Sequence, residues 1–376
     1  MRLWGEKGGE SAHRMREQQG ITDIAEMVAD LPLGERERFQ GIFHISSSIG
    51  RLNPPPTMHK WIEGHFGSVE SVLEQRIVRI TNLVTMEGAL FNGLRSQRPM
   101  VIEKPQQLEK LIAEDLGGPF CQPLEGTPED IFGRVEGRYS VTASNIAKFD
   151  GLHGVVIFDE HDPLTFSEER IGDYIDTALE WAQEARAMDE DARYFFFLWN
   201  CIWRAGASIV HGHAQVVLGR DMHYAKVEHL RRAALEYKKA TDRNYFDDLY
   251  RVHHILGLTL DVGSIRILAY LTPIKEKEIF LISEGLDDSL KSCMYRVLDC
   301  YVQGLGVSSF NLVIYMPPIG PVEEDWSGFP VLVRIIDRGD PLNRTADMGA
   351  MELYASSIIS SDPFRVIEVL RDGVKR

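Results

Sequence analysis

Residues 209–218 alternate polar and apolar side chains in a way that restricts how this chain can fold. They read I-V-H-G-H-A-Q-V-V-L, so His211, His213 and Gln215 occupy every second position. Side chains on a β-strand alternate between its two faces, so a strand here places all three polar groups on one face. The apolar residues on either side favour a strand. The sequence therefore predicts a sheet with one edge that carries two imidazoles and an amide.

Small residues come just before this segment and point to phosphate chemistry. Gly206, Ala207 and Ser208 let the backbone approach a phosphate, whose oxygens the N–H groups and the Ser208 hydroxyl could hold. A neutral imidazole is a competent nucleophile near pH 7, and its attack on phosphorus leaves a phosphoramidate that a second acceptor can open. The second histidine could orient the first or bind a metal. The alternative is two histidines in a half-buried strand, satisfied by backbone carbonyls.

The segment and its flanks resemble the active-site stretch of the galactose-1-phosphate uridylyltransferase branch of the histidine-triad superfamily. That family has an Asn, a Gly-x-Ser and then H-x-H-x-Q, and the chain matches it at the family's spacing with Asn200, Gly206, Ser208, His211, His213 and Gln215. The resemblance implies that His213 is nucleotidylated and that Gln215 contacts the transferred phosphoryl group. It also implies that Asn200, Gly206 and Ser208 hold the phosphates or the nucleophile. In this superfamily, Gln in place of a third His goes with transferases and phosphorylases.

Two other stretches resemble the same family. Residues 94–99 read L-R-S-Q-R-P after an expected strand that starts at Arg76, and they match an R-x-x-R-P element near the family's phosphate site. The match implies that Arg95 and Arg98 bind phosphate oxygens, and the alternative is two solvated surface arginines. Asn145, where an expected strand meets a turn, lies where the superfamily places an Asn close to the base or ribose.

The resemblance also implies a zinc site with one ligand position open. The family often has C-P-x-C here, but this chain has Gly118 in place of the first Cys and keeps Cys121. His161 and His211 fill two more of the family's ligand positions. A structural zinc takes four ligands, so water or a carboxylate such as Asp115 would complete the set. The alternative is that the metal is lost and that the remaining ligands pack as polar residues.

Composition limits the class of partner. The 376 residues are 44% hydrophobic and 26% charged, which is ordinary for a globular protein. The formal net charge of −15 argues against non-specific binding to nucleic acid or to anionic membranes. The four cysteines show no disulfide-framework spacing, no apolar run is long enough to cross a bilayer, and residues 1–26 lack an apolar signal core. We therefore expect a cytoplasmic protein.

The order of expected elements suggests an internal duplication. The segment from 154 to 218 predicts strand, helix, strand and strand, with a capping box at Thr165 and Glu168 that starts the helix. Residues 278–336 repeat this order, with apolar residues and Arg334 at the H-x-H position. We predict an α+β fold of two histidine-triad-like repeats, each an antiparallel sheet with packed helices. The expected division is a partly helical N-terminal extension (1–70), a catalytic repeat (71–225) and a degenerate second repeat (226–376).

The expected function is nucleotidyl transfer through a nucleotidyl-histidine intermediate, from a nucleotide-sugar to a phosphate acceptor. The nearest alternative is a phosphorylase that cleaves a nucleotide-sugar or a dinucleoside polyphosphate. A hydrolase of nucleotide conjugates and a non-catalytic nucleotide-binding protein stay open as well. These residues do not distinguish uracil, adenine and guanine. The family resemblance leads us to expect a homodimer.

Overall fold

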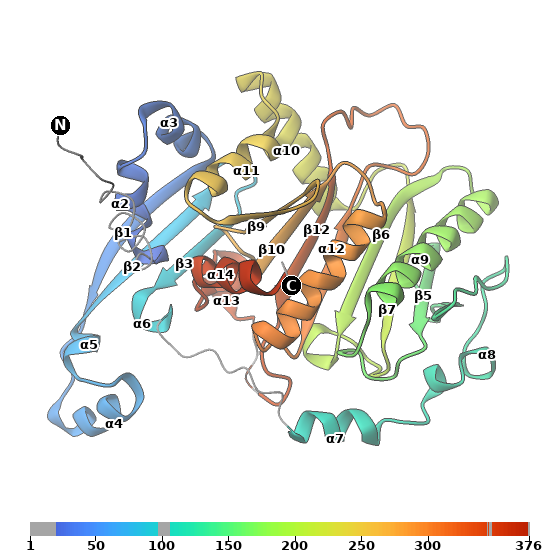
Figure 1. Ribbon diagram of the computed structural model, residues 1–376, viewed down its shortest axis with the longest axis horizontal. Coiled ribbons are helices and arrows are strands. Elements are labelled where there is room, and N and C mark those ends of the chain that lie inside the picture. The colour runs from blue at the N-terminus through green and yellow to red at the C-terminus, as the bar shows by residue number, and fades with distance from the viewer. Residues whose placement is uncertain (1–19, 97–105, 344, 346–347, 375–376) are drawn as a thin grey trace, which may run out of the picture.

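A nine-stranded antiparallel sheet forms the centre of the computed structural model, which describes residues 20–96, 106–343, 345 and 348–374 (Figure 1). Each strand pairs antiparallel with its neighbours. Across the sheet the strands are β4 (Ser140–Ser144), β5 (Leu152–Phe158), β7 (His213–Arg220), β6 (Ala192–Cys201), β11 (Phe310–Tyr315), β12 (Val331–Asp337), β10 (Glu276–Ser283), β9 (Ile265–Ala269) and β8 (Thr259–Val262).

The sheet consists of two similar halves that meet at β6 and β11. The first half runs β4-β5-β7-β6, and the second runs β9-β10-β12-β11 in the same sequence-to-space order, with β8 added at its edge. At the junction, Asn200 of β6 lies directly opposite Asn311 of β11. The α+β class and the two-repeat architecture predicted from the sequence are therefore confirmed.

Helices cover one face of this sheet. In each half a long helix connects the second and third strands of that half: α9 (Glu168–Met188) and α12 (Asp288–Asp299), which continues as a π-helical turn (Cys300–Gly304). The helix α14 (Pro363–Gly373) packs beside them over β8, β9 and β10 (Figure 1). An apolar stripe that includes Ile171, Tyr174 and Ala178 buries one side of α9, and Tyr174 stacks on Phe158 of β5.

The start of α9 differs from the predicted capping box. Ser167 is the N-cap residue, and its side chain accepts a hydrogen bond from the backbone N–H of Arg170. Thr165 instead donates its hydroxyl to Asp162 in the preceding turn. The predicted helix is correct from Glu168 to Met188, but the residue that caps it is wrong, because the local turn at Asp162 holds Thr165 away from the first helical turn.

A second, four-stranded sheet lies beside the first. Its order is β1 (Phe43–Arg51), β2 (Glu74–Asn82), β3 (Gly88–Asn92) and β13 (Ser357–Ile359), and β13 pairs parallel to β3. The predicted boundary after residue 70 stays a prediction, although β1 and β2, which lie on either side of it, pair over nine residues. The remaining elements are η1 (Ile21–Asp23), α2 (Ile24–Ala29), α3 (Leu33–Ile42), α4 (Pro56–Phe66), α5 (Glu70–Leu73), α6 (Gly93–Ser96), α7 (Gln106–Glu114), η2 (Pro119–Cys121), α8 (Pro123–Gly126), η3 (Trp203–Ala205), α10 (Ala225–Thr241), α11 (Tyr245–Ile255) and α13 (Ala350–Tyr354).

A buried charge network joins the two sheets. Arg334 of β12 donates from Nε to Glu278, and its Nη2 lies 2.9 Å from a carboxylate oxygen of Glu87, which follows β2. Asn82 at the end of β2 donates to the hydroxyls of Tyr245 and Tyr270. A buried arginine between two carboxylates has its charge compensated inside the protein. The Arg334 side chain thus has a structural role.

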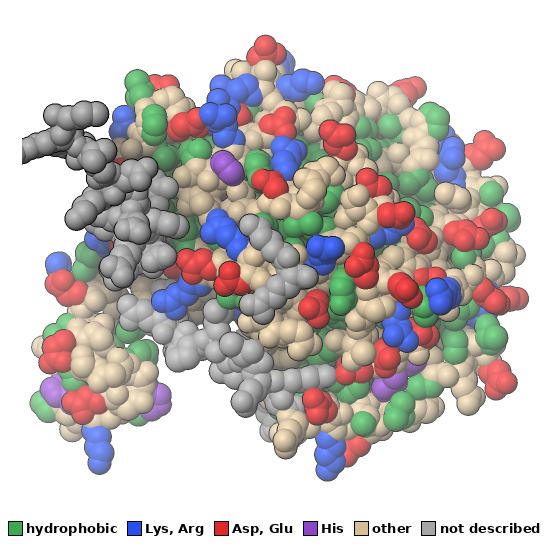
Figure 2. Space-filling model, viewed as in Figure 1, with side chains coloured by type: hydrophobic (Ala, Val, Ile, Leu, Met, Phe, Trp, Pro, Cys, Tyr) green, Lys and Arg blue, Asp and Glu red, His purple; other side chains and the backbone are tan. Residues whose placement is uncertain are grey.

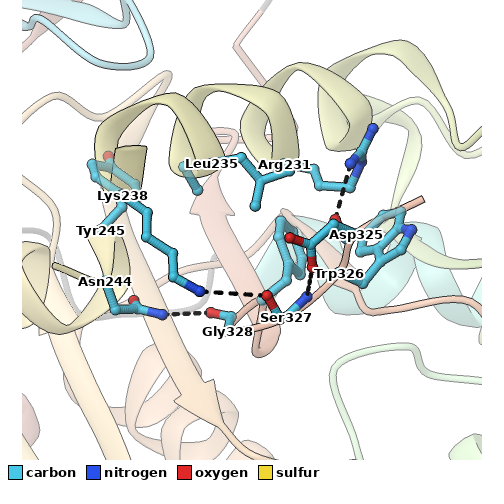
Figure 3. Close-up of a pocket in the computed structure, with 11 residues that line it drawn as sticks. Arg231, Leu235, Lys238, Asn244, Tyr245, Asp325, Trp326, Ser327 and Gly328 are labelled. Carbon is cyan, nitrogen blue, oxygen red and sulfur yellow. Dashed lines mark hydrogen bonds between the residues drawn. The ribbon is translucent and has the colours of Figure 1, made fainter. Parts of the chain in front are cut away.

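The connection between the last two strands differs between the two halves of the sheet. In the first half, residues 202–212 lead from β6 into β7. The corresponding segment of the second half, 316–330, docks on α10 (Figure 3), where Arg231 donates to the carbonyl of Asp325 and Asn244 to that of Gly328. Trp326 lies beneath the Arg231 guanidinium at 5.4 Å. These contacts hold the second connection against α10 and the start of α11. Among the described residues, no helix is long and apolar enough to cross a membrane.

Candidate active site

His213 is the first residue of β7 and lies almost fully buried on the face of the sheet that α9 does not cover. Its Nδ1 lies 2.8 Å from the carbonyl oxygen of His211. A carbonyl only accepts, so Nδ1 carries the proton and Nε2 keeps its lone pair. Burial lowers the pKa of His213, which favours the neutral imidazole. Phe120 packs edge-on against the ring at 5.1 Å. The result is an oriented, neutral imidazole whose Nε2 keeps a free lone pair.

Gln215 lies on the same face of β7, and His153 of β5 fixes its orientation. The backbone N–H of Phe149 donates to Nδ1 of His153, so the proton of this imidazole is on Nε2. That Nε2 lies 2.9 Å from the side-chain oxygen of Gln215 and donates to it. With its oxygen occupied, the carboxamide presents its NH₂ group to the open side. The side-chain nitrogen of Asn145 lies 3.3 Å from the same Nε2, so Asn145 also borders Gln215.

The loop between β6 and β7 is a tight turn held by backbone conformation. Ile202 has φ of +70° and Gly206 has φ of +98°, both in the left-handed region, where a β-branched residue is strained. The side chain of Ser208 is exposed. Within the described part of the chain, no hydrogen bond engages the Ser208 hydroxyl. Gly206 and Ser208 therefore lie exposed on this turn at the end of β6, and their role in holding phosphate stays a prediction.

The second half of the chain supports this turn. Asn311 of β11 donates to the side-chain oxygen of Asn200 (2.7 Å) and to the carbonyl of Ala205 (2.8 Å). Arg338 in turn donates to the side-chain oxygen of Asn311 at 2.7 Å. Arg204 donates to the carbonyl of Arg338. The turn that carries Gly206 is thus anchored by residues of the second half of the sheet.

Cys121, His161 and His211 form the predicted ligand cluster. Their ligand atoms lie within 4.8 Å of one another, with Sγ of Cys121 3.5 Å from Nδ1 of each histidine and the two Nδ1 atoms 3.2 Å apart. His211 lies just before β7, so of the three predicted polar residues only His213 and Gln215 belong to the strand. The strand begins at His213, and the irregular backbone before it lets the His211 ring point to the cluster.

This cluster fits a tetrahedral metal. Bond lengths of about 2.3 Å for Zn–S and 2.05 Å for Zn–N place the ligands of a tetrahedron about 3.6 Å (S to N) and about 3.3 Å (N to N) apart. The observed separations agree. Each imidazole also donates its Nε2–H to a backbone carbonyl, His161 to Ile112 and His211 to Phe158, both at 2.8 Å, so each Nδ1 faces the cluster unprotonated. Asp115 lies outside the cluster of ligand atoms.

The predicted arginine pair is not brought to this site by the described residues. Arg95 lies in α6, after the last strand of the hairpin β2–β3, with an exposed side chain. No hydrogen bond or ion pair joins it to another described residue. Arg98 lies outside the described residues. The role of both arginines as phosphate ligands stays a prediction.

Sequence reasoning missed Asn311, Arg338 and the link between His153 and Gln215. One signal was available for Asn311, which stands in the strand F-N-L-V-I-Y, because asparagine is uncommon in an otherwise apolar strand. The contact of His153 with Gln215 depends on the pairing of β5 with β7, in which His153 lies opposite Val217. That register is set by tertiary structure, and the sequence contains no local signal for it.

The fold of this chain is similar to that of several solved structures. No family model matches the sequence, and no curated protein sequence matches it. Three solved structures align with most of the chain. An ADP-glucose phosphorylase from Arabidopsis thaliana with bound ADP-glucose aligns at TM-score 0.58 and 18% identity, over 77% of this chain and 96% of that one. A uridylyltransferase aligns at TM-score 0.54 and 14% identity, over 78% and 98%. The chain has the uridylyltransferase fold.

A GalT-like protein from Arabidopsis thaliana aligns as well, at TM-score 0.55 and 18% identity, over 69% of this chain and 92% of that one. The resemblance inferred from the H-x-H-x-Q segment is therefore confirmed at the level of the fold. In this uridylyltransferase fold, the chain carries its candidate nucleophile and its candidate metal ligands at the start of β7 and in the segments around it.

Proposed function

We propose that the chain is a nucleotidyltransferase of the galactose-1-phosphate uridylyltransferase type, which moves a nucleoside monophosphate from a nucleotide-sugar to a phosphate acceptor. The observation that carries the proposal is the tautomer of His213. Its Nδ1–H is bound to the His211 carbonyl, which leaves Nε2 as a free nucleophile beside the oriented amide of Gln215. The shared fold with a uridylyltransferase and an ADP-glucose phosphorylase supports it.

The proposed reaction has two displacements at one phosphorus. Nε2 of His213 attacks the α-phosphorus of the donor, an N–P bond forms, and the P–O bond to the departing sugar phosphate breaks. A phosphate oxygen of the acceptor then attacks the same phosphorus and breaks the N–P bond, which returns His213 to its neutral form. The NH₂ group of Gln215, the backbone after Gly206 and the Ser208 hydroxyl stabilise the charge on the non-bridging oxygens. Arg95 and Arg98 would add to this, and Asn145 would contact the nucleoside.

We propose that Cys121, His161 and His211 hold a structural zinc, with water as the fourth ligand. The separations of the three ligand atoms and their backbone-bonded imidazoles support the metal. A zinc bound there would hold the segment around Cys121 against the start of β7. The ring of Phe120, next to Cys121, packs on His213, so the cluster positions one wall of the nucleophile's surroundings.

Intact mass measurement tests the covalent step. The protein is mixed separately with UDP-glucose, ADP-glucose, GDP-glucose and diadenosine tetraphosphate, and each reaction is quenched at alkaline pH to preserve a phosphoramidate. A nucleoside-monophosphate adduct that is absent from His213→Ala would identify the nucleophile and the base together. Binding of a donor without an adduct would favour a non-catalytic nucleotide-binding protein.

The acceptor separates the proposed transferase from the alternatives. The labelled protein is isolated and exposed to hexose-1-phosphate, to inorganic phosphate or to buffer alone. Loss of the adduct with hexose-1-phosphate supports the uridylyltransferase type. Loss with inorganic phosphate alone indicates a phosphorylase of nucleotide-sugars or dinucleoside polyphosphates, for which the fold of the ADP-glucose phosphorylase is the supporting observation. Loss in buffer indicates a hydrolase.

His153 should act as a positioning residue for Gln215. In His153→Phe the ring still stacks on Phe149, but the proton donor to the Gln215 oxygen is lost. We expect kcat to fall about 10-fold, in line with one lost hydrogen bond, and Gln215→Ala to cost about 100-fold, as for one oxyanion donor. Because both changes act on one contact, the double variant should be no slower than Gln215→Ala alone. Additive losses would show that His153 serves the fold rather than Gln215.

A further inference from the structure

The turn after β6 begins at a strained residue. Ile202 is β-branched and has φ of +70°. A non-glycine residue keeps such a conformation only where its surroundings enforce it, and residues of this kind are frequent at functional sites. The carbonyl of Ile202 accepts from the backbone N–H groups of Ala205 (3.0 Å) and Ala207 (3.3 Å), which closes the turn. The conformation of this turn decides where Gly206 and Ser208 lie, so the contacts that hold it affect the candidate site.

A segment that follows β12, residues 338–343 with Thr345, lies against this turn and is called the strap here. Its first residue is tied to the sheet. The backbone N–H of Arg338 donates to the carbonyl of Ser309 at 2.9 Å. The hydroxyl of Ser309 donates to the carbonyl of Cys201, the last residue of β6, also at 2.9 Å. The strap therefore starts at the end of the sheet where β6 ends and β7 begins.

Two neighbouring side chains of η3 hold the strap. Trp203 donates its indole N–H to the carbonyl of Pro341 at 3.0 Å. Arg204 donates to three carbonyls of the strap: that of Arg338 at 3.2 Å from Nε, that of Asn343 at 3.1 Å from Nη1, and that of Thr345 from the same Nη1. A guanidinium carries its donors in a rigid planar fork, so it bridges several acceptors in a fixed geometry. The contacts of η3 thus extend from the first residue of the strap to the last.

These partners leave the positive charge of Arg204 in place. All three are carbonyl oxygens, and no carboxylate among the described residues pairs with this guanidinium. Asp and Glu side chains are spread over the face of the molecule in Figure 2, in keeping with the formal net charge of −15. A phosphorylated donor therefore meets an unfavourable field from the protein as a whole. Arg204 places a positive charge two residues before Gly206.

We propose that Arg204 is a positioning residue for nucleotidyl transfer, because it joins the strap to the turn and so holds Ser208 and the backbone beside it where the donor phosphates bind. Trp203 assists through its contact with Pro341. The inference rests on the proposed function of the site. Donors on the turn would act on charge that develops at phosphorus in the transition state, so a displaced turn should slow the formation of the adduct more than it weakens donor binding.

Rapid-quench measurement of adduct formation tests this role, with whichever of UDP-glucose, ADP-glucose and GDP-glucose labels the wild type. Arg204→Lys keeps the charge, but one ammonium cannot reproduce the fork. We expect the rate of labelling at His213 to fall about 10- to 100-fold, while the dissociation constant of the donor changes less than about threefold. Trp203→Phe keeps an aromatic ring and loses the N–H, so a smaller loss of about 3- to 10-fold is expected. Labelling of Arg204→Lys at the wild-type rate, or equal losses in binding and rate, would overturn the proposal.

Arg371 of α14 provides the matched control. Its Nη2 donates to the carbonyls of Gly257 and Thr259, so it also joins distant segments through backbone oxygens, but at the β8 edge of the sheet. Arg371→Lys should lower the thermal midpoint about as much as Arg204→Lys and should label His213 at the wild-type rate. If Arg371→Lys slowed labelling equally, Arg204 would serve only the stability of the fold.

Hydrogen exchange distinguishes a failure of this proposal from a failure of the proposed reaction. Backbone amides of residues 203–210, followed by mass spectrometry, should exchange faster in Arg204→Lys than in the wild type and should be unchanged in Arg371→Lys. If no donor labels the wild type, the proposed reaction is wrong and the role of Arg204 in it is lost, while faster exchange would still show that the strap holds the turn. Unchanged exchange at residues 203–210 would overturn the proposal whether or not the wild type is labelled.

Discussion

Replacing His213 with alanine should eliminate nucleotidyl transfer while leaving the fold intact. The change removes the only group that we propose to bond covalently to phosphorus, so the route through a nucleotidyl intermediate is closed. We expect turnover to fall by at least about 10⁴-fold, the scale on which loss of an enzyme nucleophile acts. Initial rates with the donor that labels the wild type measure the effect. Donor binding, followed by calorimetry, should change little.

A second histidine provides the matched control for this variant. His254 in α11 forms a hydrogen bond with the hydroxyl of Thr259, and neither residue contacts the candidate active site around His213. His254→Ala should retain the rate of the wild type within a few-fold. If His213→Ala kept near-full activity, or if the adduct persisted in it, the proposed mechanism would be wrong.

Replacing a candidate metal ligand should lower the stability of the protein more than its activity. In Cys121→Ser we expect zinc, measured by inductively coupled plasma mass spectrometry, to fall from about one ion per chain to near zero. The thermal midpoint should fall by roughly 5–10 °C, because one kcal/mol corresponds to about 2–4 °C in proteins of 150–250 residues and a bound structural metal contributes to folding free energy. A chelator should lower the midpoint of the wild type in the same way.

Two variants sharpen the metal experiment. Cys300→Ser makes the same chemical change at a thiol that donates to the carbonyl of Val369, and it should leave zinc content unchanged. Gly118→Cys restores the family's first cysteine at a position where an added Cβ meets only one backbone oxygen, at 3.8 Å. It should slow the loss of zinc to a chelator. The metal proposal would be wrong if the wild-type protein contained no zinc and a chelator left its thermal midpoint unchanged. Cys121, His161 and His211 would then only pack together.

The elements that could be predicted from the sequence are those with a local signal. The apolar stripe of α9 at helical spacing and the alternation in β7 each identify an element from adjacent residues. The candidate metal ligands Cys121, His161 and His211 lie far apart in the chain, and the structure brings them together as the family pattern implied. Here the local motif and the fold agree, because the motif includes the strand that orders the site.

What could not be predicted depends on pairing between distant strands. The strand β2 of the four-stranded sheet was expected from the sequence, but the sheet itself was not, since its fourth strand, β13, comes from residues 357–359. The same holds for Asn311, which reaches Asn200 only because β6 and β11 are neighbours. Partners of this kind are determined by the assembled sheet, so they become visible only in the structure.

The hydrogen bond between Asn200 and Asn311 spans 111 positions of the chain, and this has a consequence for folding. Contacts between residues so distant in sequence carry a large loop-closure cost and form slowly. During synthesis, β6 and β7 leave the ribosome long before β11 exists. The turn that carries Gly206 is therefore supported only after the second repeat has been made and has docked. Catalytic competence should be the last property that this chain acquires as it folds.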